Sequence, residues 1–307
     1  MLEENGQSSL FADAAQRDTF FAAYDLLMAN RWPISFETRD IETRFGTTHV
    51  ITSGPPGGRP VVLLHGGGTC SAMWYSIVGN LAEAGYRTIA PDRVGDVGRS
   101  TIIEVPDDPQ KLADWILDCL DALDLDSPPM IGLSYGAFMN INFARFHPSR
   151  IGSIIMLTPG GVFAKLRLWW TLRMAVSIGS GYRPFIRNAF SYIAGGREPE
   201  EDLFELASLA WSVWKGPEYM PPVYTDEELR AIKHPSLLLV GDRDVIYDPG
   251  KVLHRAASVM PDIETALIPG GGHTLSTDEP AAVSNCIVSF LSKHGDSADQ
   301  GDTSDRE

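Results

Sequence analysis

Ser134 is the residue with the clearest chemical potential, because it occupies the centre of a Gly-x-Ser-x-Gly pattern at positions 132–136. The residues before it form a short apolar run typical of a buried strand, and those after it place apolar side chains at helical spacing. A strand that enters a helix directly must turn sharply, and the two glycines let both elements pass closely. Such a turn would expose the Ser134 hydroxyl as a nucleophile. The alternative is an ordinary strand–turn–helix with an incidental serine.

A serine nucleophile requires a base, and His273 has the best context among the seven histidines. It follows the strand expected at 264–268 and the glycines at 270–272, so no side-chain bulk holds its imidazole away from the serine. His65 instead lies in a glycine-rich loop, where we interpret it as structural.

The acid is expected in the loop after the strand at 236–240, where Asp242, Asp244 and Asp248 compete. We favour Asp244, because the acid of such triads commonly lies just past the strand and the loop glycine. The alternative for each aspartate is a place in a solvated turn. The resulting order of serine, aspartate and histidine along the chain is one of the known orders of a serine triad.

Attack on a carbonyl group also needs two backbone N–H groups aimed at the developing oxyanion. One is expected from Tyr135, directly after the nucleophile, and the other from Gly67, with Gly68 as the competing donor. Residues 66–68 are all glycine, which brings the backbone close to a substrate and leaves free space beside the leaving alcohol. The loop resembles that of hydrolases with three successive glycines, and this resemblance implies tolerance of esters of tertiary alcohols. Two alternatives stand beside this prediction. The Tyr135 ring refills the space, or the glycines form a tight turn without effect on selectivity.

The elements that must position these residues follow an alternating order. Strand and helix patterns alternate over 60–157 and again over 226–291, which specifies a mostly parallel, doubly wound α/β sheet. A helix at 8–31 and a β-hairpin at 41–52 precede it. Residues 160–225 carry only helical patterns and are expected to cap the carboxyl edge of the sheet, where sites of such folds lie. The expected organisation is a first core part at 1–159, a helical cap at 160–225, a second core part at 226–294 and a disordered acidic tail at 295–307.

Four of the seven tryptophans lie in the expected cap, at positions 169, 170, 211 and 214. They either wall an apolar pocket or hold together the core of the cap itself. Trp211 and Trp214, together with Gly68, are the candidates for substrate binding. Lys165, Arg167 and Arg173 interrupt an apolar stretch of the cap. In an acidic protein this pattern favours a solvated cap face over a membrane-surface helix.

The composition narrows the classes of function. Of 307 residues, 44% are hydrophobic and 21% charged, and no apolar run reaches the roughly 18 residues of a membrane span. A formal net charge of −15 disfavours nucleic acid and anionic membranes as main partners. The three scattered cysteines fit neither a disulfide framework nor a metal site, and the N-terminus lacks signal-peptide features. We therefore expect a cytoplasmic protein without metal or other cofactor, and the oligomeric state stays open.

Several stretches resemble the α/β-hydrolase superfamily and, within it, the naproxen-esterase-type carboxylesterases (carboxylesterase NP). They are residues 44–51, 130–134, 224–230 and 245–249, and the resemblance covers nearly the whole chain. It implies a cofactor-independent, cytosolic serine esterase with a helical cap. The expected reaction is hydrolysis of apolar or bulky small-molecule esters through an acyl-enzyme. The alternatives are another serine-triad reaction, such as C–C bond hydrolysis or perhydrolysis, and a non-catalytic ligand receptor on the same fold.

Overall fold

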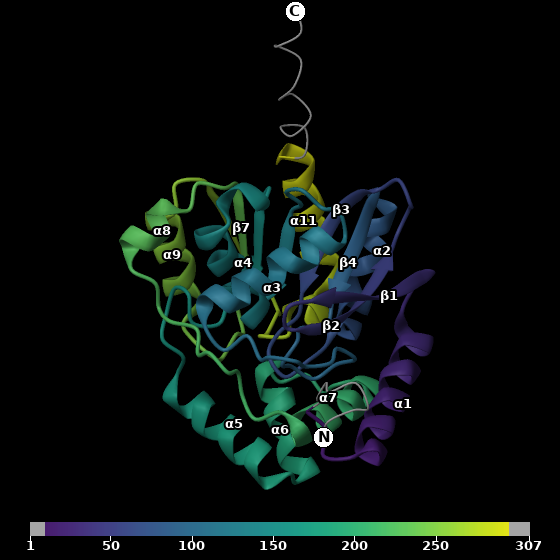
Figure 1. Ribbon diagram of the computed structural model, residues 1–307. Coiled ribbons are helices and arrows are strands. Elements are labelled where there is room, and N and C mark those ends of the chain that lie inside the picture. Colours follow the sequence, from purple (N-terminus) through teal and green to yellow (C-terminus); the bar gives the residue numbers. More distant parts are fainter. Residues whose placement is uncertain (1–9, 295–307) are drawn as a thin grey trace, which may run out of the picture.

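The computed structural model describes residues 10–294, and the acidic tail expected at 295–307 lies outside that range. The strands are β1 (Phe36–Thr43), β2 (Gly46–Ser53), β3 (Arg59–Leu64), β4 (Tyr86–Pro91), β5 (Met130–Leu133), β6 (Ile154–Leu157), β7 (Ser236–Gly241) and β8 (Ile263–Ile268). They form one sheet in the order β1-β2-β4-β3-β5-β6-β7-β8. β2 pairs antiparallel with β1 and β4, and the other pairings are parallel. The expected mostly parallel α/β sheet is therefore confirmed (Figure 1).

Helices cover both faces of this sheet. They are α2 (Tyr75–Glu83), α3 (Pro109–Ala122), α4 (Tyr135–Phe146), α8 (Asp226–Ala231), α9 (Pro249–Val259), α10 (Leu275–Asp278) and α11 (Pro280–His294). α2 and α11 belong to one hydrophobic layer, and α3, α4 and α9 to the other. β5 and β6 are buried along their whole length, as expected of parallel strands covered on both faces. Because parallel strands end at the same edge, the loops after β3, β5, β7 and β8 meet there.

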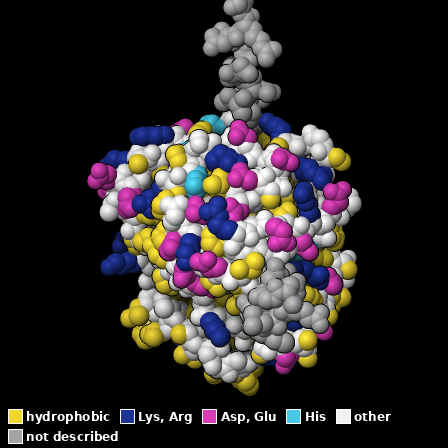
Figure 2. Space-filling model, viewed as in Figure 1, with side chains coloured by type: hydrophobic (Ala, Val, Ile, Leu, Met, Phe, Trp, Pro, Cys, Tyr) yellow, Lys and Arg dark blue, Asp and Glu magenta, His cyan; other side chains and the backbone are white. Residues whose placement is uncertain are grey.

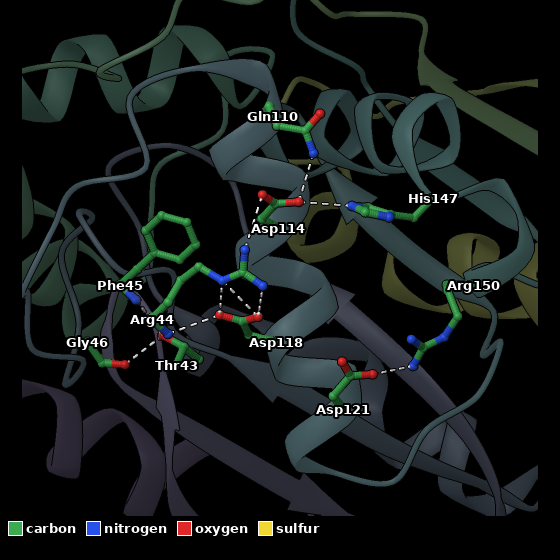
Figure 3. Close-up of polar contacts among 10 residues, drawn as sticks. All are labelled: Thr43, Arg44, Phe45, Gly46, Gln110, Asp114, Asp118, Asp121, His147 and Arg150. Atoms are coloured by element: carbon green, nitrogen blue, oxygen red, sulfur yellow. Dashed lines mark hydrogen bonds and ion pairs between the residues drawn. The ribbon is translucent and has the colours of Figure 1, made fainter.

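The turn of the β1–β2 hairpin is fastened to α3 through Arg44 (Figure 3). The guanidinium donates to the two carboxylate oxygens of Asp118 at 2.7 Å and 2.9 Å, and to Asp114 at 3.3 Å. Asp114 also accepts a hydrogen bond from Gln110 at 2.8 Å and lies 3.1 Å from His147 Nε2. These contacts hold the antiparallel edge of the sheet against its helical layer.

A 3₁₀ turn precedes α2. Ser71–Trp74 forms this turn, and Ser71 does not cap the helix that follows it, although serine is a common N-cap residue. The Ser71 hydroxyl and backbone N–H instead donate to Asp92 Oδ1, at 2.5 Å and 2.7 Å. Asp92 is fully buried just after β4, and a buried carboxylate requires hydrogen-bond donors. The serine therefore serves this distant aspartate instead of the helix end.

The helical insertion follows β6 and consists of α5 (Leu168–Ser180), α6 (Arg183–Ile193) and α7 (Glu201–Val213). Figure 1 shows the three helices together beneath the sheet, and they lie within the segment 160–225 that is expected to form a cap. The N-terminal helix α1 (Ala14–Arg31) packs along α7, where Arg31 pairs with Glu200 at 2.5 Å and Asp202 at 2.7 Å. None of the helices within residues 10–294 has the length and apolar character needed to cross a membrane.

Candidate active site

Ser134 forms the turn between β5 and α4, with φ at 51° and ψ at −105°. A non-glycine residue in this region carries strain of about 1–3 kcal/mol, which the surrounding structure must enforce. The flanking glycines make the turn possible. A Cβ at Gly132 would lie 2.3 Å from the carbonyl carbon of Gly136, and a Cβ at Gly136 would lie 2.0 Å from the carbonyl oxygen of Leu64. The sequence pattern therefore corresponds to a strained turn that only these small residues allow.

The structure brings Ser134, His273 and Asp244 together in one line of hydrogen bonds. Ser134 Oγ lies 2.9 Å from His273 Nε2, and His273 Nδ1 lies 2.9 Å from Asp244 Oδ2. The Asp244 side chain is fully buried, and its other oxygen accepts a hydrogen bond from the Ile246 N–H at 3.0 Å. A buried carboxylate on Nδ1 favours the tautomer that leaves Nε2 free to accept the serine proton.

The two competing aspartates have other partners. Asp242 Oδ1 accepts from the Gly270 N–H at 2.7 Å, and Asp248 caps the N-terminus of α9 through the Lys251 N–H at 3.1 Å. Burial, with the nearby charge of Asp244, raises the pKa of Tyr247 well above its usual value. The neighbouring phenol of Tyr247 therefore stays neutral. Of the three aspartates, Asp244 is the one whose carboxylate contacts the imidazole of His273.

The two candidate N–H donors in the glycine loop after β3, those of Gly67 and Gly68, differ in their hydrogen-bond partners. The Gly68 N–H donates to both carboxylate oxygens of Asp96, at 3.1 Å and 3.2 Å. The N–H groups of Gly67 and Tyr135 have no hydrogen-bond acceptor among residues 10–294. Tyr135 is the first residue of α4, whose N–H has no acceptor within the helix. The pair of unengaged donors is therefore Gly67 and Tyr135, and Gly68 serves the fold.

A buried ionic network stabilises this loop from behind. Arg93 donates to Asp96 at 2.9 Å and to Glu218, which the cap supplies, at 3.2 Å. The guanidinium also lies 5.0 Å from the centre of the Tyr135 ring. Sequence reasoning did not identify this network, because Glu218 lies 125 residues beyond Arg93 and the short spacing of Arg93 and Asp96 matches no motif. Its effect is to fix the loop of Gly68 and the residue after Ser134 against the cap.

Ser134 and His273 open into a cavity of about 500 Å³ between the core and the cap. Apolar side chains dominate its walls, among them Met73, Trp170, Phe190, Leu206, Trp211 and Trp214. Trp169 does not contribute, since it is 81% exposed on the outside of the cap, so the pocket-wall alternative holds for three of the four cap tryptophans. Among residues 10–294, no group of three or more His, Cys, Asp and Glu side chains could hold a metal ion.

Trp214 covers the glycine loop. A Cβ added at Gly67 would lie 3.3 Å from the Trp214 ring, and one added at Gly68 would lie 2.9 Å from it. The Tyr135 hydroxyl donates to the carbonyl oxygen of Tyr219 at 3.0 Å, which anchors that ring to the cap. The space beside Gly67 is therefore bounded by Trp214.

Comparison with known proteins identifies the family of the fold. Residues 59–176 match a model of the alpha/beta hydrolase fold. The chain is 35% identical over 269 residues to the uncharacterized carboxylesterase nap of Bacillus subtilis (strain 168), covering 85% of this chain and 88% of the relative. The chain belongs to the α/β-hydrolase superfamily.

Two further relatives match nearly the whole length of this hydrolase. The chain is 31% identical to the carboxylesterase YbfK of the same organism, over 92% of this chain and 97% of the relative. The crystal structure of naproxen esterase (carboxylesterase NP) from Bacillus subtilis superposes with a TM-score of 0.83 at 31% identity, covering 95% of this chain and 99% of that one. The resemblance inferred from the sequence is therefore confirmed.

The loop that carries the histidine of this hydrolase is fixed on several sides by groups that sequence reasoning missed. The His273 N–H donates to the Ile193 carbonyl oxygen of the cap at 2.6 Å, and its carbonyl oxygen accepts from Thr158 Oγ1 at 3.0 Å. The Asp278 carboxylate accepts from the Gly272 N–H at 2.8 Å and from Thr274 Oγ1 at 2.9 Å, one residue on either side of the histidine. Burial raises the pKa of Asp278 to about 6, although its hydrogen bonds act in the opposite direction.

Because its pKa is raised, Asp278 makes the free energy of unfolding depend on pH. The folded chain holds this proton more tightly than the unfolded chain, so stability from this group falls as pH rises from about 4 to about 6. Relative to that of Asp278→Asn, the free energy of unfolding of the wild type should fall by about 2–3 kcal/mol over that range. Above that range the difference should not grow further. Urea unfolding of both proteins across this range measures the difference. The exposed Asp262→Asn is the control, and a difference that does not change with pH contradicts the assignment.

Proposed function

We propose that this chain hydrolyses apolar or bulky carboxylic esters through Ser134, His273 and Asp244. It is a carboxylic ester hydrolase, the class named for its relatives over nearly the whole chain. The observation that carries the proposed mechanism is the 2.9 Å contact of Ser134 Oγ with His273 Nε2 at the floor of an apolar cavity. The proposed setting is the cytoplasm, supported by free thiols at Cys70, Cys119 and Cys286.

The proposed reaction has two halves. His273 Nε2 takes the Ser134 proton while Oγ attacks the ester carbonyl carbon, and the N–H groups of Gly67 and Tyr135 bind the resulting oxyanion. The tetrahedral intermediate collapses, the alcohol leaves with the proton from His273, and Ser134 keeps the acyl group. His273 then takes a proton from water, whose oxygen attacks the acyl carbon. The bond between this carbon and Ser134 Oγ breaks, Oγ takes the proton back from His273, and the acid leaves. Asp244 stabilises the imidazolium in both halves.

The cavity supports apolar substrates. Most of its lining is hydrocarbon, and burial of apolar surface stabilises a bound ligand by about 25 cal/mol per Å². Among the described residues that line the cavity, His273 and Lys215 have basic side chains. Lys215 is exposed to solvent. A charged acyl or alcohol group would thus lack a buried partner and be disfavoured.

A fluorophosphonate probe tests the chemistry directly, because it reacts with an activated serine. It should label the wild-type chain at Ser134, with mass spectrometry locating the adduct, and should not label Ser134→Ala. A panel of esters that vary in acyl and alcohol size then tests the substrate class. Absence of both labelling and ester turnover would favour a ligand receptor. Labelling without ester turnover would favour another serine-triad reaction, such as C–C bond hydrolysis.

The glycine loop predicts selectivity for the leaving alcohol. A methyl group at position 67 would press on Trp214 at 3.3 Å and fill the space that a branched alcohol needs. Gly67→Ala should therefore lower kcat/KM for tert-butyl acetate about tenfold more than for n-butyl acetate. Trp214→Ala should shift the ratio the other way, because it opens the same space. Ester hydrolysis rates for both substrates measure the effect.

Gly57→Ala is the matched control, because a Cβ there meets no atom within 4 Å. It should leave both rates unchanged. If the wild type does not cleave tert-butyl acetate, or if both rates fall together in Gly67→Ala, the loop does not select the alcohol. In the second case the methyl group acts on the oxyanion donor itself.

A further inference from the structure

The helix α5 carries apolar side chains on the side that faces solvent. Leu168, Trp169, Leu172 and Val176 are all exposed, Trp169 by 81% and Val176 by 60% of their surface. At 100° per residue these four positions lie within one arc of about 100°, so they form a single face, here called the outer α5 face. Figure 2 shows hydrophobic side chains gathered over the lower left of the molecule, where Figure 1 places this helix. Tyr182 and Phe185, at the start of α6, are exposed as well.

The charge around this face differs from that of the whole protein. Residues 160–197 contain six lysines and arginines and no aspartate or glutamate, in a chain whose net charge is −15. Three of the six, Arg183, Arg187 and Arg197, pair with glutamates. The other three, Lys165, Arg167 and Arg173, form no ion pair with any carboxylate in residues 10–294. The Arg173 guanidinium donates to Asn188 Oδ1 and lies 4.3 Å from the centre of the Tyr192 ring, so it is held against α6. Lys165 and Arg167 are exposed and directly precede α5.

We propose that the outer α5 face, with Lys165 and Arg167, docks on an anionic phospholipid surface, with α5 lying parallel to it. Tryptophan, leucine and valine on one side, flanked by lysine and arginine, are the features of a helix that lies in a lipid interface. The local positive charge dominates this contact, because charges beyond about 8–10 Å are screened at physiological salt. A second copy of the chain is a poorer occupant, since both copies carry the same net charge of −15.

The other side of α5 faces the active-site cavity. Trp170, Met174 and Ile178 line that cavity and are half-buried. α5 would thus separate the lipid surface from the cavity by a single helix. If the proposed esterase function holds, apolar esters dissolved in the lipid would pass around this helix to Ser134. Docking itself does not depend on that function.

Vesicle binding tests the proposal without any contribution from catalysis. The full chain with Ser134→Ala is mixed with vesicles of phosphatidylcholine alone, or of phosphatidylcholine with phosphatidylglycerol, and sedimented. We expect binding to the mixed vesicles that weakens as salt rises. Trp169 is 81% exposed, and the other six tryptophans are buried or partly buried. Its emission should therefore shift to shorter wavelength on binding, and this shift should be absent from Trp169→Phe.

Two double variants separate the apolar and the charged contributions. Trp169→Ser with Val176→Ser, and Lys165→Gln with Arg167→Gln, should each weaken vesicle binding about tenfold or more. The matched controls alter equally exposed residues elsewhere. Ile103→Ser, and Arg39→Gln with Lys233→Gln, should bind as the parent protein does. Circular dichroism and Tm establish that every variant is folded.

Three results would overturn the proposal. The first is no binding to either kind of vesicle, and the second is binding that the α5 variants and the controls weaken equally. The third is a dimer, seen by analytical ultracentrifugation without lipid, that shields Trp169 from quenching and disappears in the α5 variants. That result would assign the face to a second copy of the chain. Ester hydrolysis by the wild type is measured separately on a water-soluble ester, so a failure of docking is distinct from a failure of the esterase proposal.

Discussion

Replacing Ser134 by alanine is expected to lower kcat by about 10⁶, the largest effect of any single change in this chain. The hydroxyl supplies the atom that attacks the ester, and it lies 2.9 Å from the base that removes its proton. Residual hydrolysis of the order of 10³–10⁴ over water should remain, because the oxyanion donors and the cavity still bind the ester. Steady-state hydrolysis of an activated aryl ester measures the loss.

The substitution should leave the fold intact, which separates loss of chemistry from loss of structure. Alanine is no bulkier than serine at the strained φ of 51°, and the backbone N–H at this position keeps its 2.9 Å bond to the Leu157 carbonyl oxygen. Ser258→Ala is the control, since within residues 10–294 that exposed hydroxyl bonds only to the Arg255 carbonyl oxygen in its own helix. A decrease in kcat of less than tenfold in Ser134→Ala would show that this serine is not the nucleophile.

The members of the proposed triad were accessible to sequence reasoning because each lies at most five residues beyond the end of a strand. The runs before Ser134, Asp244 and His273 are apolar and end near glycines, so local patterns place all three at one edge of the sheet. The mostly parallel sheet and the helical cap were predictable for the same reason, since strand and helix periods differ. What local patterns cannot give is the choice between neighbours that share the same pattern.

Two such choices depended on tertiary contacts. Gly67 and Gly68 look alike in sequence, and the deciding partner, Asp96, lies 28 residues beyond Gly68. Trp169 and Trp170 are adjacent on a helix that is apolar on nearly every side, yet one faces solvent and the other the cavity. Asp278 escaped notice because α10 spans only four residues, too few to show a helical period.

Asp244→Asn is expected to lower kcat by about 10⁴ while the fold remains. Asparagine has nearly the same shape and can keep the 3.0 Å bond from the Ile246 N–H. Its amide group, however, can donate to Nδ1 of His273, which places the ring proton on Nε2 and prevents that atom from accepting the serine proton. The imidazolium formed during reaction also loses its buried counter-charge, since the Asp244 side chain is fully buried. The pH-rate profile and kcat of the variant measure both consequences.

The two neighbouring aspartates provide matched controls, because asparagine can keep the role that the structure gives to each. Asp242→Asn retains an oxygen for the Gly270 N–H, and Asp248→Asn retains the cap of α9, since asparagine is as good an N-cap as aspartate. Each should keep kcat within about tenfold of the wild type. If Asp248→Asn is the severe variant and Asp244→Asn the mild one, the acid of the triad is Asp248. In that case the 2.9 Å contact between Asp244 and His273 orients the loop without taking part in the reaction.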